Sequence, residues 1–111
     1  MLDQIIAISM LCIQPMAIDG DTIKCENTEA RFRLFGIQAP EMGTPGAVSS
    51  KYALKRVMGD KVRCRATGGR SYGRIVARCY NLDGEDIGEL QIRRGHASEW
   101  CEYSKGIYGG C

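Results

Sequence analysis

Histidine is almost absent from this chain, because His96 is the only one among 111 residues. The six cysteines include no C-x-x-C pair, the spacing at which structural zinc sites commonly place two ligands. His96 has no metal ligand or nucleophile beside it in the sequence, and we interpret it as a structural or surface residue. The sequence therefore argues against a zinc site of the usual kind.

Long apolar runs and a strong net charge are also missing. No apolar run reaches the roughly 18–20 residues of a membrane-spanning helix. The formal net charge is only +2, so a nucleic-acid partner must be argued from the positions of the arginines and not from total charge. With 44% hydrophobic and 25% charged residues, the composition is that of a soluble globular protein. We expect one domain over residues 1–111.

The first 18 residues are largely apolar, but they lack two features of a secretory signal. The only early charge is Asp3, where a signal would carry basic residues, and no clear small-x-small cleavage site follows. We therefore interpret residues 1–11 as an N-terminal arm or the beginning of a first strand.

Six cysteines in a chain of this size favour a disulfide framework and an extracytoplasmic location, periplasmic or secreted. Cys64 and Cys79 are equidistant from the centre of a glycine-rich turn, so they face each other across a hairpin. Cys12 and Cys25 are nearly symmetric about another turn. The remaining cysteines would tie down the C-terminal tail, residues 100–111. The predicted pairs are Cys12–Cys25, Cys64–Cys79 and Cys101–Cys111.

The order of expected elements is three strands, a helix, two strands and a short helix. Apolar alternation and turn residues predict strands at 10–18, 22–26, 30–37, 61–66 and 74–80. The helix begins after Thr44 as N-cap, ends before Gly59 and places Val48, Tyr52, Val57 and Met58 on one face. A short helical stretch near 87–94 precedes an irregular tail. Five antiparallel strands with a helix after the third predict a mainly β, α+β protein: a five-stranded OB-fold barrel stabilised by disulfides.

Alternation in the last two strands divides their residues between an inner and an outer face. Val62, Cys64, Ile75, Ala77 and Cys79 would point inward, and Arg63, Arg65, Arg74 and Arg78 outward. Such a basic face suits a polyanionic partner, such as single-stranded nucleic acid, but it is equally compatible with a merely solvated surface.

Three motifs then stand in order: "IDGDT" at 18–22, "RLFGIQAPE" at 33–41 and "SYGR" at 71–74. Together they resemble the staphylococcal-nuclease-like (thermonuclease) family, over about residues 12–100. The resemblance implies an OB-fold barrel that cleaves phosphodiester bonds of DNA and RNA with one calcium ion.

The resemblance also assigns roles to residues of this chain. Asp21 matches a metal carboxylate, Asp19 a flanking acid that supports the metal's water shell, and Ala39 a ligand through its carbonyl. The catalytic set would be Arg33 and Arg74, which grip phosphate, and Glu41, which orients or deprotonates water. Substrate contacts would come from Tyr72, with Arg70 adding positive charge nearby. Either Trp100 or Tyr103 is a candidate for the family's second substrate-facing tyrosine, although both are also explained by packing.

Gln38 departs from the family pattern, which has a metal-binding aspartate at this position. An amide oxygen can coordinate calcium, but the site loses one negative charge, which weakens the attraction for a dication. Two hypotheses follow. One is a metal-dependent nuclease with weakened metal use. The other is a non-catalytic OB-fold module that binds nucleic acid or another polyanion, or an accessory protein of extracellular polysaccharide production.

Overall fold

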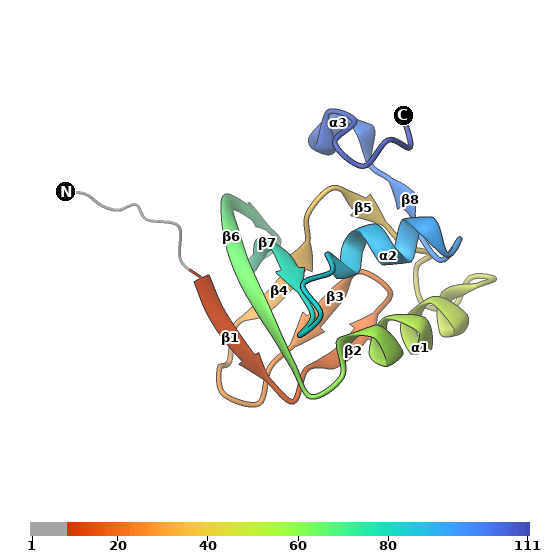
Figure 1. Ribbon diagram of the computed structural model, residues 1–111. Helices are drawn as coiled ribbons and strands as arrows, with labels where there is room; N and C mark the ends of the chain where they lie inside the picture. The colour runs from red at the N-terminus through yellow and green to blue at the C-terminus, as the bar shows by residue number, and fades with distance from the viewer. Residues whose placement is uncertain (1–8) are drawn as a thin grey trace.

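The computed structural model describes residues 9–111, which form a curled β-sheet flanked by helices (Figure 1). The six strands of the sheet are β1 (Ser9–Ile13), β2 (Met16–Asp19), β3 (Thr22–Lys24), β4 (Arg31–Leu34), β6 (Lys61–Ser71) and β7 (Arg74–Tyr80). A separate pair consists of β5 (Ile37–Gln38) and β8 (Ser98–Glu99). The helices are α1 (Ala47–Met58), α2 (Ile87–Arg93) and α3 (Cys101–Ser104). Within residues 9–111, no helix has the length and hydropathy that crossing a membrane requires.

The strand order is β1-β6-β7-β4-β3-β2, and its two edge strands are consecutive in the chain. Together β1 and β2 occupy the place of the single strand predicted at 10–18. The chain bends between them at Gln14, whose φ is 48° and whose N–H donates to the Asp60 carbonyl oxygen at 2.8 Å. One bent strand therefore joins the two edges of the curled sheet, which agrees with the predicted OB-type barrel.

The prediction that all strands are antiparallel is wrong for one pair. β4 and β7 are parallel, with Phe32 opposite Ile75 and Arg33 opposite Val76. A parallel pair needs a long crossover connection, and here α1 and the long strand β6 supply it. Strands that are far apart in sequence therefore lie side by side in the centre of the sheet.

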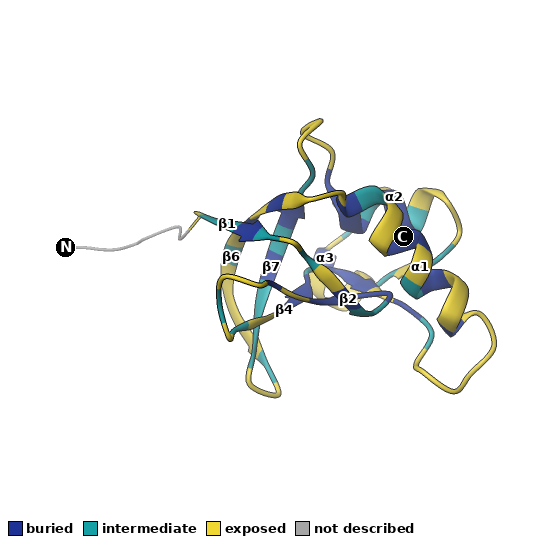
Figure 2. Cartoon of the chain, turned by 90° about the horizontal axis from the view of Figure 1, so that it is seen from below, coloured by how far each residue is buried: buried dark blue, intermediate teal, exposed yellow. Residues whose placement is uncertain are grey.

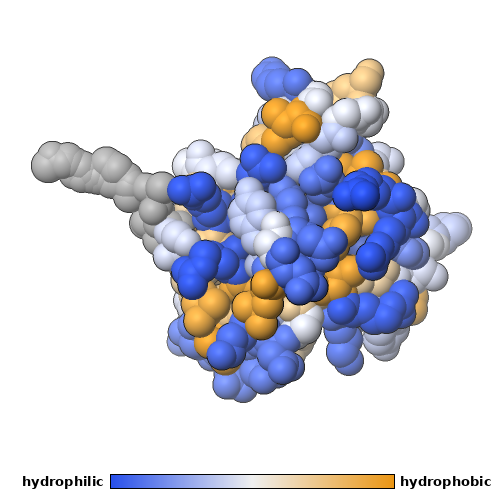
Figure 3. Space-filling model, in the orientation of Figure 1, coloured by the Kyte–Doolittle hydropathy of each residue, from blue (hydrophilic) through white to orange (hydrophobic). Residues whose placement is uncertain are grey.

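The predicted inner faces of β6 and β7 and the outer face of β6 are confirmed, whereas Arg74 and Arg78 on the outer face of β7 are only partly exposed. Val62, Cys64, Ala77 and Cys79 are fully buried, and Ile75 is partly buried against the same core. Arg63 and Arg65 are exposed, as alternation requires. The space-filling view shows mainly hydrophilic residues over the barrel, with separate hydrophobic patches between them (Figure 3).

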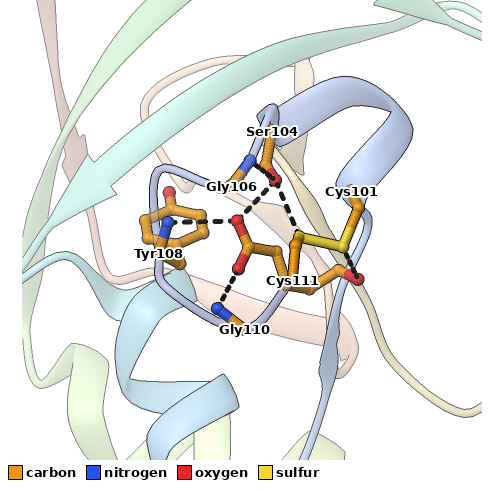
Figure 4. Close-up of a disulfide and its surroundings, with 7 residues drawn as sticks. Cys101, Ser104, Gly106, Tyr108, Gly110 and Cys111 are labelled. Atoms are coloured by element: carbon orange, nitrogen blue, oxygen red, sulfur yellow. Dashed lines mark hydrogen bonds between the residues drawn. A yellow bond between two sulfur atoms is a disulfide. The ribbon is translucent and has the colours of Figure 1, made fainter.

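All three predicted disulfides are present. Cys64 lies directly opposite Cys79 in the β6–β7 ladder, and Cys12 of β1 joins Cys25 just after β3. These four cysteines are buried in the core. The third bridge, between Cys101 and Cys111, is exposed and closes the C-terminal segment (Figure 4).

The predicted face of the helix is correct only in part: Met58 is buried and Val57 is partly buried against the core, but Val48 and Tyr52 point to solvent. Helix α1 begins after Gly46, not Thr44, and Val48 and Tyr52 are 58% and 50% exposed. Small residues face the barrel instead, because they allow close approach to the chain beneath: a Cβ at Gly20 would lie 1.8 Å from Ser50 Oγ. The buried residues of α1 are Ala47, Ser50, Ala53, Leu54 and Met58, and its two sides are distinguished in Figure 2.

The second helix agrees with its prediction. Asp86 is the N-cap of α2 and accepts hydrogen bonds from the N–H groups of Gly88 at 2.9 Å and Glu89 at 3.2 Å. The tail is more regular than expected, because β8 pairs with β5 and α3 follows it. Helices α1 and α2 pack beside the barrel, whereas the segment containing α3 projects at one end (Figure 1).

The packing of α1 can be tested with two truncations on opposite sides of the helix. Leu54→Ala should lower the free energy of unfolding by about 2–5 kcal/mol, because Leu54 is fully buried. Val48→Ala should change it by less than about 0.5 kcal/mol, because Val48 lies on the solvent side. Denaturant unfolding measures both, and equal destabilisation by the two variants would contradict this orientation of the helix.

Candidate active site

The site is built around the turn that connects β2 and β3. The side chain of Asp19 accepts a hydrogen bond from the Asp21 N–H at 3.0 Å, which stabilises the turn. The Asp21 carbonyl accepts from the Leu34 N–H at 2.8 Å, so the turn lies against β4. Gln91 secures it from α2, because its Nε2 donates to the carbonyl oxygens of Gly20 and Ser50, each at 3.0 Å. The role of Gln91 was not predicted, since no motif marks a glutamine on a short helix.

The carboxylate of Asp21 connects three segments of the chain. Its Oδ2 lies 3.3 Å from Nη2 of Arg33 and accepts a hydrogen bond from the Ala39 N–H at 2.9 Å. Its Oδ1 accepts from the Thr22 hydroxyl at 3.2 Å. Asp21 and Arg33 are 7% and 8% exposed, so this ion pair is well shielded from solvent. The carboxylate thus holds the residue that follows β5 beside β3 and β4.

Arg74 reaches the same group from β7. Its Nη1 donates to the Thr22 hydroxyl at 3.1 Å, while its Nε and Nη2 donate to the Ser71 carbonyl and hydroxyl at 2.9 and 3.0 Å. Thr22 therefore links Arg74 to Asp21. The structure brings together Asp21, Arg33 and Arg74, three residues that the sequence motifs placed far apart. The sequence analysis assigned no role to Thr22. Its position inside the IDGDT motif is the feature of the sequence that could have indicated one.

Arg33 is also held by the C-terminal segment. Its guanidinium lies 5.5 Å from the ring centroid of Trp100, and its Nη1 donates to the Leu34 carbonyl at 2.8 Å. Trp100 in turn donates its backbone N–H to the Gly36 carbonyl at 2.7 Å and makes an edge-to-face contact with Tyr103. Trp100 therefore does more than fill the tail, since it fixes one side of the Arg33 guanidinium.

Glu99 organises that segment through hydrogen bonds to three residues. Its carboxylate accepts hydrogen bonds from the Ser104 hydroxyl and from the N–H groups of Tyr108 and Gly110. These hydrogen bonds and the Cys101–Cys111 disulfide close the segment into a compact loop. A loop held at both ends keeps Trp100 in place beside Arg33.

The other predicted substrate residues lie at the hairpin between β6 and β7. Tyr72 is 98% exposed at the tip of this turn with a φ of 50°, and its ring centroid lies 6.0 Å from the Arg74 guanidinium. Arg70 is exposed and lines a pocket of about 330 Å³ together with Arg33, Trp100 and Tyr103. The position of both residues permits contact with a ligand bound at the arginines.

Gln38 is the last residue of β5, and Glu41 lies in the loop that follows it. Both are exposed, and within residues 9–111 no ion pair joins Glu41 to Arg33 or Arg74. Gln38 pairs with Ser98 in β8 and lines a shallow hollow of about 540 Å³. The loop from 41 to 46 is exposed throughout. Gln38 and Glu41 are therefore close in sequence to Ala39, which contacts Asp21, but neither side chain is hydrogen-bonded to Asp21, Arg33 or Arg74 within residues 9–111.

Burial raises the pKa of Asp21 from its ordinary value of 3.8 to about 6. The neighbouring Asp19 acts in the same direction, whereas the Ala39 N–H and Arg33 oppose the shift. Burial also lowers the pKa of Arg33, although Asp21 opposes this. Near neutral pH the pair therefore consists of a carboxylate and a guanidinium, but the carboxylate is easily protonated.

A sequence model of the staphylococcal nuclease homologue family matches residues 31–108, which include both arginine-bearing strands β4 and β7. The chain belongs to the staphylococcal nuclease homologue family. The Asp19–Asp21 turn precedes the matched segment, and its contact with Arg33 connects it to the family region.

The chain is also similar to a curated protein, the succinoglycan biosynthesis protein ExoI of Rhizobium meliloti (strain 1021). The two are 33% identical over 107 residues. The alignment covers 86% of this chain and 55% of ExoI, so the chain spans about half the length of this relative.

Membership of this nuclease family implies a calcium ion, and the donor atoms near Asp21 can be compared with that requirement. The donors that the motifs offer are oxygens, as a hard cation requires: the Asp21 and Asp19 carboxylates, the Gln38 amide and the Ala39 carbonyl. Asp19 and Ala39 are hydrogen-bonded to Asp21, whereas among residues 9–111 Gln38 has no hydrogen bond to it. Among residues 9–111, however, no three His, Cys, Asp or Glu side chains gather as a metal-binding group. The type of donor atom fits calcium, but the donor set carries one negative charge fewer than the family pattern, because Gln38 replaces an aspartate.

The raised pKa of Asp21 predicts a specific pH dependence in chelator. Between pH 4 and 6 Asp21 is more protonated in the folded protein than in the unfolded chain, so its contribution to stability falls as pH rises through this window. Wild type should lose about 2 kcal/mol more than Asp21→Asn over this range, because the shift from 3.8 to about 6 disappears with the carboxyl group. Denaturant unfolding at several pH values measures the difference, and parallel curves would contradict the shift.

Proposed function

We propose that this chain is a metal-dependent phosphodiesterase that acts as an endonuclease on DNA or RNA. The observation that carries the proposal is the convergence of Arg33 from β4 and Arg74 from β7 on the Asp21–Thr22 pair. Two guanidinium groups on adjacent strands supply planar donors for a phosphate, and the parallel pairing of β4 with β7 holds them together.

The two arginines would share the work on the phosphate. Each guanidinium can donate two hydrogen bonds to phosphoryl oxygens and stabilise the negative charge that builds there in the transition state. Arg33 is fixed by Asp21 and Trp100, so it is oriented before the substrate binds. Arg74, beside the exposed ring of Tyr72, would hold the phosphate from the β6–β7 hairpin.

Glu41 is proposed as the residue that orients or deprotonates the attacking water. It stands two residues beyond Ala39, whose N–H is bonded to Asp21, so the chain fixes the start of its loop at the site. An exposed carboxylate in a loop can approach a bound phosphate without a large change in the barrel. A protein that only binds polyanions gains nothing from an acid in this position.

The metal would be held by Asp21, with the Gln38 amide oxygen and the Ala39 carbonyl as further ligands and Asp19 supporting its water shell. When bound, a calcium ion supplies positive charge that orients the phosphate and neutralises its developing charge. Gln38 in place of a carboxylate should cost a few kcal/mol of binding, which corresponds to orders of magnitude in affinity. We therefore propose weak metal binding.

Single-stranded nucleic acid outside the cytoplasm is the proposed substrate. Three disulfides favour an oxidising compartment such as the periplasm or the extracellular space. Exposed bases of a single strand can stack on aromatic side chains, and Tyr72 and Tyr103 are available beside the arginines.

A non-catalytic role is the second candidate. The neutral Gln38 and the name of the relative, which refers to succinoglycan biosynthesis, favour a polyanion-binding accessory protein of extracellular polysaccharide production. In that case the arginines would bind anionic groups and Glu41 would have no chemical role.

Hydrolysis of a labelled single-stranded DNA against calcium concentration tests the proposal. Wild type should cut, a chelator should stop it, and Gln38→Asp should lower the calcium concentration needed by about 10–100-fold, since each factor of ten is about 1.4 kcal/mol. Glu41→Gln should reduce kcat by about 100-fold or more, as expected when a general base is removed.

Asp60→Asn is the matched control, because it neutralises an exposed acid in the turn between α1 and β6. It should leave cleavage unchanged. Cleavage by Gln38→Asp but not by wild type would support the non-catalytic role. Absence of cutting in all variants would reject the nuclease proposal.

A further inference from the structure

A second feature of the surface lies beside the candidate site. A broad groove of about 1170 Å³ runs between β2, the loop that joins β3 to β4, and helix α1. Four basic residues line it: Lys24 and Arg31 from the sheet, and Lys51 and Lys55 from α1. We call these four residues the basic groove. Two carboxylates, Glu26 and Glu29, also line it, so positive charge exceeds negative charge by two.

Strand register connects the basic groove to the arginine site. Lys24 lies opposite Arg31 in the β3–β4 ladder, and the next pair on the same face is Thr22 opposite Arg33. The alternate residues Ile23 and Phe32 are buried, whereas Lys24 and Arg31 are exposed. Residues two apart on a strand are separated by about 7 Å, which is comparable to the distance between successive phosphates of an extended nucleic-acid strand.

The neighbouring strand continues this arrangement. Phe32 is opposite Ile75 in the parallel β4–β7 pair, so Arg31 and Arg74 occupy neighbouring places on the outer face. Positive charge therefore extends across the sheet from β7 through β4 to β3. A polyanion gripped at Arg33 and Arg74 would meet Arg31 and Lys24 next.

Helix α1 forms the far wall of the groove. Lys51 and Lys55 are four residues apart and lie on one face of the helix. Between them Tyr52 is half exposed, and Met16 on β2 is 61% exposed across the groove. An aromatic ring beside lysines is the combination that binds single-stranded nucleic acid, because bases stack on the ring while the phosphates contact the cations.

We propose that the basic groove binds the phosphates of single-stranded nucleic acid that flank the bond held at Arg33 and Arg74. This inference rests on the proposed function, because it takes the strand to be anchored at the arginines. Binding in the basic groove would make the protein prefer longer nucleic-acid strands over short ones, since only a longer strand reaches from the arginines to α1.

Fluorescence anisotropy of labelled oligothymidylates in EDTA tests binding without cleavage. Wild type should bind a 12-mer more tightly than a 4-mer. Replacing Lys24 and Arg31, or Lys51 and Lys55, by alanine should weaken 12-mer binding by about tenfold. The slope of log affinity against log salt should become shallower by about 0.7 for each phosphate that the variant no longer neutralises. Binding of the 4-mer should change by less than about twofold.

The control is Arg93→Ala with Arg94→Ala, which removes the same charge from exposed positions at the end of α2 outside the groove. The groove proposal is overturned if this control weakens 12-mer binding as much as the groove variants do, or if wild type binds the 12-mer no better than the 4-mer. It is also overturned if a polyuronate competes more strongly than unlabelled oligothymidylate, because the occupant would then be an acidic polysaccharide.

A cleavage assay on a short phosphodiester separates this inference from the proposed function. If wild type cuts the short substrate but shows no groove-dependent binding, only the groove proposal fails. If groove-dependent binding is found without any cutting, hydrolysis fails and the groove proposal stands.

Discussion

The arrangement of this site depends on one buried ion pair, between Asp21 and Arg33. The carboxylate of Asp21 also accepts the Ala39 N–H and the Thr22 hydroxyl, so one side chain joins β3, β4 and the segment after β5. Burying such a pair is costly unless its remaining hydrogen-bonding positions are filled. Here they are filled by main-chain and hydroxyl groups, and the raised pKa of Asp21 records the cost of desolvation.

The barrel places the second arginine. Arg33 and Arg74 come from strands that are separated in sequence by helix α1 and strand β6. Both nevertheless contact the Asp21–Thr22 pair, because β4 and β7 are parallel neighbours in the sheet. The C-terminal segment completes the arrangement, since Glu99 and the third disulfide hold Trp100 against Arg33. Rigid strands thus supply the two arginines, whereas Glu41 stands on an exposed loop.

Sequence patterns predicted the barrel strands well where alternation was strong. Val62, Cys64, Ala77 and Cys79 are buried as expected, and the Cys64–Cys79 bridge followed from the symmetry of its hairpin. Patterns failed for part of α1, because Val48 and Tyr52 were placed on the same face as the buried Met58, yet both are exposed. The barrel surface beneath α1 instead requires small residues, as the close approach of Gly20 and Ser50 illustrates. The bend at Gln14 was not predicted either, because residues 10–18 are mostly apolar and such a stretch indicates one continuous strand.

By itself the sequence determined the family and the type of fold, because motifs and alternation are local properties of the chain. It also revealed that Gln38 stands where a carboxylate is expected. Only the tertiary structure decided that Arg33 is buried against Asp21 and Trp100, that Gln91 secures the turn from α2, and that Lys24 and Arg31 continue the basic surface toward α1. These relations join residues across strands and helices, and such distances are set by packing and register, which no local pattern encodes.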